Sequence, residues 1–126
     1  MTLPHIVLSV LALYMVQLFL QETTRYRFSL RLITGNRDNP PPISLMAARL
    51  ERAKNNMIEA LPFFLGFAML DLVSLDVSEA ANSGALIFLL ARMAYIPAYM
   101  SGIPWVRSLI WLVANTGLLV MAWPLT

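Results

Sequence analysis

Cysteine is absent from this chain of 126 residues, and histidine occurs once, at His5. Without cysteine the chain has no disulfide, no thiolate metal site and no cysteine nucleophile, and one histidine cannot supply a histidine-rich metal centre. We therefore expect no metal site. Charge is also scarce: 13% of the residues are charged, whereas 59% are hydrophobic. A soluble domain of this length needs more charge to cover its surface, so the composition indicates a membrane protein.

Uncharged runs divide the chain into four expected spans. Residues 1–21 and 108–126 contain no Asp, Glu, Lys or Arg, and each run suits one crossing of about 20 residues. Runs 60–70 and 80–91 are too short alone and reach that length only if their helices also contain Glu59 and Arg92. We predict an all-α, integral membrane four-helix bundle, with residues 1–126 as a single domain. Its helices are expected at roughly 3–31, 44–75, 79–100 and 104–124.

The connections between these helices differ in charge. The first connection is basic and ends in three prolines, which stop a helix, so that the next helix is expected to begin near Ser44, a plausible N-cap. The second connection, 71–83, contains three acidic residues and no Lys or Arg. Because basic loops stay in the cytoplasm, we expect a multi-pass protein with both termini on the non-cytoplasmic side. The basic residues cluster beside spans, so we expect no nucleic-acid partner. No basic segment precedes the first apolar run and no cleavage site follows it, which favours a retained span over a signal peptide.

Two polar stripes fall within the expected second and third helices. Four residues of the second helix, spaced 3, 4 and 3 apart, lie within an arc of about 80° on one helical face: Arg49, Arg52, Asn56 and Glu59. This stripe descends about 15 Å, which places its last two residues below the membrane surface. The third helix carries a similar stripe on one face: Arg92, Tyr95 and Tyr99.

Charges at this depth are costly unless they face each other or a wet pocket. We expect Glu59 to pair with an arginine, Arg52 being the nearest on its own face. A small bundle has little room for this many arginines, so we expect the stripes to meet at subunit interfaces. Buried Arg–Glu pairs can serve only to hold helices in register. Alternatively, because four arginines including Arg107 outnumber Glu59, a pocket with surplus guanidinium groups would bind a small polycarboxylate. Both interpretations stay open.

Two segments carry a resemblance to a known family. The segment 49–63, RLERAKNNMIEALPF, and the segment 91–99, ARMAYIPAY, resemble the second- and third-helix signatures of the membrane-associated proteins in eicosanoid and glutathione metabolism (MAPEG). Arg107-Ser108 follows at a suitable distance. Residues 35–42, GNRDNPPP, and 101–107, SGIPWVR, look like the bacterial members, and the similarity extends over nearly the whole chain from residue 25.

The resemblance implies a homotrimer, in a bacterial inner membrane, that binds glutathione between neighbouring subunits near the cytoplasmic face. Its binding residues would come from both stripes: Arg49, Arg52, Asn56, Glu59, Arg92, Tyr95 and Tyr99. Arg107 would be catalytic and lie near the thiol, unless it only anchors the chain beside Pro104. The implied activity is that of a glutathione transferase or peroxidase acting on hydrophobic electrophiles or lipid hydroperoxides.

Several alternatives remain open within this resemblance. The chain is expected to be either such an enzyme or a non-catalytic membrane subunit or scaffold with the family fold. A first-helix arginine also contributes in some members, and the candidates here are Arg25, Arg27 and Arg31. Substrates would enter from the bilayer along the first and fourth helices. Aromatic and Met residues of the fourth helix, such as Trp111 and Met121, are expected to face lipid or to pack.

Overall fold

The computed structural model describes residues 2–25, 44–74 and 76–126. Within them the backbone forms four long helices, α1 (Leu3–Arg25), α3 (Leu45–Val73), α4 (Glu79–Ser101) and α5 (Pro104–Ala122), followed by the short 3₁₀ helix η1 (Trp123–Leu125). All four long helices are long and apolar enough to cross a membrane. The predicted all-α architecture with four spanning helices is confirmed.

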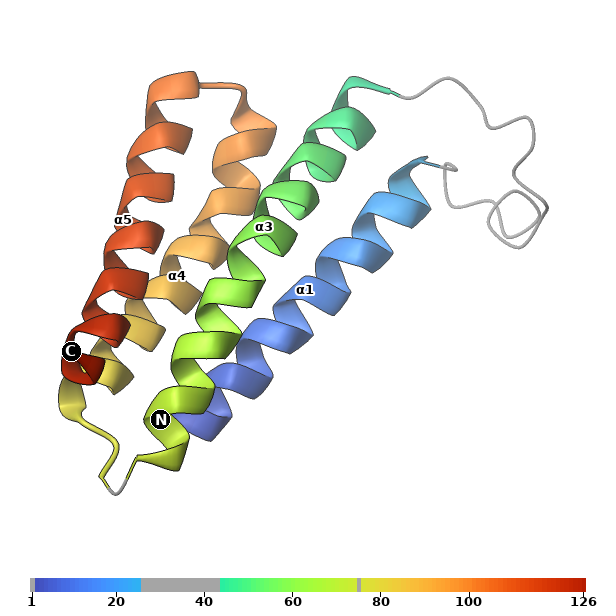
Figure 1. Ribbon diagram of the computed structural model, residues 1–126. Coiled ribbons are helices and arrows are strands. Elements are labelled where there is room, and N and C mark those ends of the chain that lie inside the picture. The colour runs from blue at the N-terminus through green and yellow to red at the C-terminus, as the bar shows by residue number, and fades with distance from the viewer. Residues whose placement is uncertain (1, 26–43, 75) are drawn as a thin grey trace.

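The helices run up and down beside one another (Figure 1). The α4–α5 turn lies at the same end of the bundle as the end of α1 and the start of α3, and both chain termini lie at the opposite end with the α3–α4 connection. This arrangement puts the basic expected connections at one end and the acidic connection at the other. We refer to the first as the basic end.

Local sequence accounts for the helix ends. Ser44 caps α3 as predicted, because its side chain accepts a hydrogen bond of 3.1 Å from the Ala47 N–H. At the other end of the bundle, the Ser78 side chain caps α4 in the same way. Gly102 ends α4 in the left-handed region, at φ 76°, which glycine adopts without strain. The first helix is followed as far as Arg25, and the remainder of its expected range, 26–31, lies outside the described residues.

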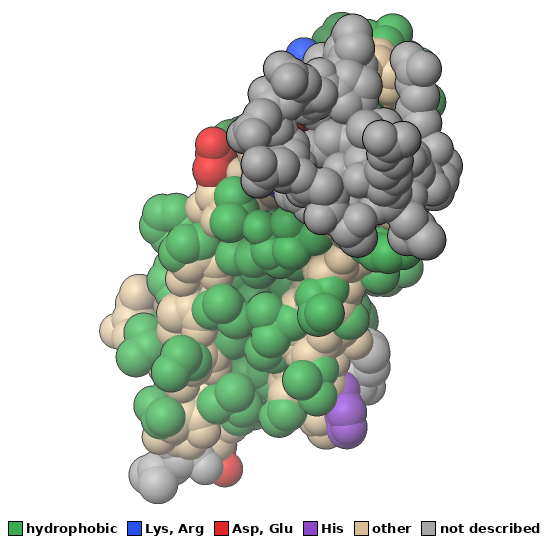
Figure 2. All heavy atoms as spheres, turned by 90° about the vertical axis from the view of Figure 1, so that its right-hand side faces the viewer, with side chains coloured by type: hydrophobic (Ala, Val, Ile, Leu, Met, Phe, Trp, Pro, Cys, Tyr) green, Lys and Arg blue, Asp and Glu red, His purple; other side chains and the backbone are tan. Residues whose placement is uncertain are grey.

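The core lies toward the end that holds the termini. Phe64 of α3 stacks on Phe88 of α4 with ring centroids 4.7 Å apart, and both rings are fully buried. Arg92 follows Phe88 by one turn of α4 and packs against its ring. The aromatic pair therefore separates the apolar core from the polar residues nearer the basic end. The face along α1 is largely hydrophobic between the two ends of the bundle, as far as the described residues cover it (Figure 2). Such a face suits lipid.

Two glycines bring α4 and α5 into backbone contact near the same end. A Cβ atom built on Gly84 would lie 2.6 Å from the carbonyl oxygen of Gly117, and one built on Gly117 would lie 2.7 Å from that of Gly84. Neither position therefore has room for a side chain, and this close approach fixes α4 against α5. Arg92, Tyr95 and Tyr99 of α4 and Arg107 of α5 lie further toward the basic end.

Candidate functional site

The two polar stripes meet within one chain. The Arg92 guanidinium on α4 donates from Nη1 to Oδ1 of Asn56 on α3 over 2.7 Å, and only 2% of Arg92 is exposed. Its guanidinium carbon lies 5.4 Å from the ring centroid of Phe88 and 5.1 Å from that of Tyr95. The prediction that the stripes meet between subunits rather than within one bundle is wrong for this contact. The bundle accommodates the guanidinium because two rings of its own helix enclose it.

Arg92 keeps unused donor capacity after this contact. A guanidinium has five N–H donors, and the buried Nε of Arg92 has no hydrogen-bond partner among the described residues. A buried donor without a partner is costly, and a ligand or water would relieve that cost. The contact with Asn56 therefore holds the arginine in place and leaves at least one of its N–H donors for a ligand.

Tyr99 of α4 contacts basic residues of two other helices. The guanidinium carbon of Arg107 on α5 lies 4.8 Å from the Tyr99 ring centroid, and that of Arg52 on α3 lies 5.8 Å from it. Tyr95 meets the same ring edge to face at 5.6 Å. Cation–π attraction thus holds two arginines close together that would otherwise repel each other.

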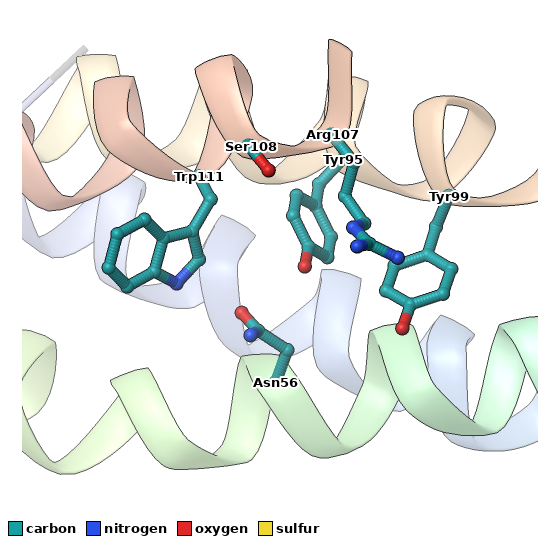
Figure 3. A pocket seen from close by; sticks show the side chains of 6 residues that line it. All are labelled: Asn56, Tyr95, Tyr99, Arg107, Ser108 and Trp111. Atoms are coloured by element: carbon teal, nitrogen blue, oxygen red, sulfur yellow. The ribbon is translucent and has the colours of Figure 1, made fainter. Parts of the chain in front are cut away.

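A pocket of about 280 Å³ opens between α3, α4 and α5 beside this cluster. We call it the mouth chamber, and it is lined by Asn56, Tyr95, Tyr99, Arg107, Ser108 and Trp111. The side chains from α4 and α5 reach toward Asn56 on the facing helix (Figure 3). Its lining thus combines one cation with hydroxyl, amide and aromatic groups, which suits an anionic, hydrogen-bonding ligand.

A second pocket of about 170 Å³ lies further from the basic end. We call it the deep chamber, and it is lined by Asn56, Glu59, Ala60, Phe63, Arg92, Trp111 and Asn115. It shares Asn56 and Trp111 with the mouth chamber. A carboxylate and a guanidinium therefore line one small chamber, and together they offer a partner for each charge of an α-amino acid group.

The expected pair between Glu59 and Arg52 does not form within the described residues. Glu59 is exposed beside the deep chamber and makes no ion pair there. The physical reason is that Arg52 lies about 10 Å nearer the basic end, at seven residues of helix, and turns to Tyr99 instead. The Glu59 carboxylate is left available for a cation from a ligand or a second subunit.

Arg49 lies apart from both chambers. Its Nη1 donates to the carbonyl oxygen of Met100 over 2.8 Å, and its guanidinium packs against Gly102. A cation at the end of α4 satisfies a terminal carbonyl and opposes the negative end of the helix dipole. Arg27 and Arg31, and the side chain of Arg25, lie outside the described residues, so the open choice among first-helix arginines stays open.

Sequence reasoning missed the part of the site that α5 contributes beyond Arg107. Trp111 lines both chambers rather than only facing lipid or packing, and Ser108 and Asn115 each line one chamber. The signal was present, because these three residues follow Arg107 at one, four and eight positions, which is a single helical face. Met121, in contrast, is fully buried in the core, as expected of a packing residue.

Comparison with known proteins identifies a family. A model described as the MAPEG family matches residues 1–125. No curated protein and no solved structure matches the chain. Because the matched range includes all four spanning helices and every residue of both chambers, the chain belongs to the MAPEG family.

Proposed function

We propose that this protein binds glutathione in the two adjacent chambers and uses it in a transferase or peroxidase reaction on hydrophobic electrophiles or lipid hydroperoxides. Membership of the MAPEG family fits a glutathione-related membrane protein. The observation that carries the proposal is the arrangement of charges in the two chambers, which we together call the cleft. Glu59 and Arg92 line its deep chamber, and Arg107 lines its mouth chamber.

Glutathione has the groups that this arrangement would satisfy. It carries two carboxylates, one ammonium group and a thiol. In the deep chamber, the ammonium would bind the Glu59 carboxylate and an adjacent carboxylate would bind the free donors of Arg92. The second carboxylate would lie nearer the basic end, where Arg52 approaches Tyr99.

Arg107 would act on the thiol. A guanidinium beside a thiol stabilises the thiolate, which is the nucleophilic form, and lowers the pKa of that thiol. The thiol proton would pass to solvent at the basic end. The sulfur would then attack an electrophilic carbon and form a C–S bond, and a leaving group such as halide would depart with the electron pair of its bond to that carbon. With a hydroperoxide, the sulfur would take the terminal oxygen and release an alcohol, and a second glutathione would then reduce the sulfenic acid with formation of a disulfide and water.

The proposal includes a homotrimer in a bacterial inner membrane, with the basic end in the cytoplasm. An exposed Glu59 supports assembly, because a carboxylate below the membrane surface should not face lipid. Closed cyclic assembly is the usual way in which identical subunits cover such a face. Native mass spectrometry from detergent should show trimers, and a monomer alone would contradict this part.

Calorimetric titration with glutathione tests binding. Glu59→Gln removes the carboxylate for the ammonium group and keeps the shape, so we expect about a tenfold loss of affinity, equivalent to about 1.4 kcal/mol. Glu79→Gln is the matched control, because Glu79 lies at the start of α4 at the other end of the bundle. It should bind like the unmodified protein. If the unmodified protein does not bind glutathione, the proposed function is wrong.

A non-catalytic subunit or scaffold is the second candidate. It is favoured by the contacts of Arg49 with Met100 and of Arg92 with Asn56, since both tie helices together without any ligand. Turnover assays with a reactive aromatic halide and a lipid hydroperoxide separate the candidates. Binding of glutathione without turnover of either would favour the scaffold.

A further inference from the structure

We propose that Trp111 determines which ligands fit the cleft, because its indole forms the wall between the two chambers and contacts any ligand that occupies both. This inference rests on the proposed function and adds the residue that would select slender, peptide-like molecules. Trp111 lies on α5, opposite Asn56 of α3 (Figure 3).

A ligand that occupies both chambers would have to pass between these two residues. Asn56 and Trp111 are the residues that line both chambers. Asn56 is held in place by its hydrogen bond from Arg92. The indole N–H of Trp111 donates to nothing within the described residues. One side of the passage is therefore fixed, and the other is a flat ring whose donor is free for a ligand.

The sizes of the chambers require a ligand to pass this wall. Pockets for small molecules usually enclose about 300–1,000 Å³, and neither chamber, at about 280 and 170 Å³, is large enough by itself for a tripeptide. Arg107 and Asn115 are eight residues apart, which is about 12 Å along α5. An extended tripeptide spans about 10 Å, so it would reach from one chamber to the other with its middle against Trp111.

Trp105 provides a natural comparison. It is 67% exposed, against 43% for Trp111, and it lines an apolar groove on α5 with Pro104, Leu109 and Leu112. It lines neither chamber. The two tryptophans therefore lie on the same helix in different surroundings, Trp111 beside the polar chambers and Trp105 in an apolar surface groove.

Fluorescence of single-tryptophan variants tests the inference. The pair Trp105→Phe/Trp123→Phe keeps Trp111, and the pair Trp111→Phe/Trp123→Phe keeps Trp105. On titration with glutathione, Trp111 emission should change and saturate at the affinity measured by calorimetry, whereas Trp105 emission should stay constant. In vesicles of brominated phosphatidylcholine, the acyl bromines should quench Trp105 at least about twofold more than Trp111, in the order of their exposure.

The possible results separate the inference from the proposed function. Binding by calorimetry with no change in Trp111 emission would overturn the inference alone. Absence of binding would overturn the proposed function. In that case vesicle quenching still decides the position of Trp111, and quenching equal to that of Trp105 would show that it faces lipid.

Substitution of Trp111 tests whether this residue determines which ligands bind. Trp111→Phe keeps a flat ring, so glutathione affinity should stay within about threefold. Trp111→Ala joins the chambers and removes the ring contact, so glutathione affinity should fall about tenfold. The larger S-hexylglutathione should lose little, because its alkyl group fills the vacated space. The ratio of the two affinities should therefore shift about fivefold or more toward S-hexylglutathione. Trp105→Ala is the control and should leave the ratio unchanged. Equal losses for both ligands would indicate a structural role only.

Discussion

The two ends of the same helix pair, α4 and α5, are built in opposite ways. Near the chain termini the helices touch through Gly84 and Gly117, where neither backbone has room for a Cβ atom. Near the basic end the space beside them is lined by Tyr95, Tyr99 and Arg107 and holds the mouth chamber. Two glycines thus fix α4 against α5 at one end of the pair, and large polar side chains line an open pocket at the other end. A membrane protein of this size can then hold a polar cleft without losing a packed core.

The largest expected effect comes from Arg92, which packs on Phe88 of the core and also lines the deep chamber. Arg92→Leu puts an apolar side chain in place of the guanidinium. The Oδ1 atom of Asn56 then loses its donor, and the deep chamber loses its cation. Glutathione affinity should fall about 100-fold, equivalent to about 2.7 kcal/mol. Arg92→Lys should recover part of this loss, because it keeps the charge but not the forked donors. Calorimetry on folded variants measures both. Unchanged affinity in Arg92→Leu would separate the buried arginine from the site.

The glycine contact is tested by adding one methyl group. Gly84→Ala or Gly117→Ala forces the α4 and α5 backbones apart and should lower the free energy of unfolding by about 1–3 kcal/mol. Gly66→Ala on α3 is the matched control, since a Cβ atom there meets nothing within 4 Å. It should be neutral or stabilising because alanine favours helix. Thermal unfolding in detergent measures all three, and equal stability of the first two would contradict the close approach.

Arg107 tests the chemistry of the open end. Arg107→Ala should leave glutathione affinity within a few-fold but lower turnover about 10- to 100-fold, because one or two pKa units change the thiolate fraction by about that much. The thiol of bound glutathione would then titrate at higher pH. The rate of the variant should therefore keep rising at pH values where that of the unmodified protein has levelled off. A normal rate with an unmoved pH profile would leave Arg107 as an anchor beside Pro104.

The smallest expected effect separates two arginines of one stripe. Arg49→Ala removes the cap on Met100 and should lower the free energy of unfolding by about 1 kcal/mol without changing glutathione affinity. Arg52→Ala should do the reverse, with a loss of affinity and little change in stability. Thermal unfolding and calorimetry on the two variants form a crossed comparison. Loss of affinity in Arg49→Ala alone would move Arg49 into the site.

The spans and the polar stripes could be predicted from the sequence because both signals are periodic and local. Each span is recognised from the summed hydropathy of about 20 consecutive residues, and Ser44 caps the helix that directly follows it. The partners of the arginines could not be predicted in this way. Arg49 meets a carbonyl 51 residues further along the chain, and Arg52 meets Tyr99 rather than Glu59 on its own face. Such choices depend on how helices are placed, which a single-helix pattern does not contain.

Trp111 shows a different limit of sequence reasoning. A tryptophan in an apolar span fits lipid, core and pocket equally well by composition. Only its spacing between Arg107 and Asn115 distinguishes it, and that pattern becomes informative once Asn56 is placed opposite. The aromatic residues of the cleft are therefore the part that required the structure.

The most direct test of a glutathione site in this cleft is the thiolate absorbance of glutathione added to the purified protein. We expect a band that saturates with glutathione at neutral pH, is much weaker with Arg107→Ala, and does not appear with S-methylglutathione, which has no thiol to ionise. Glutathione that leaves the spectrum unchanged, in a protein that calorimetry shows to be saturated, would contradict thiol activation by this cleft.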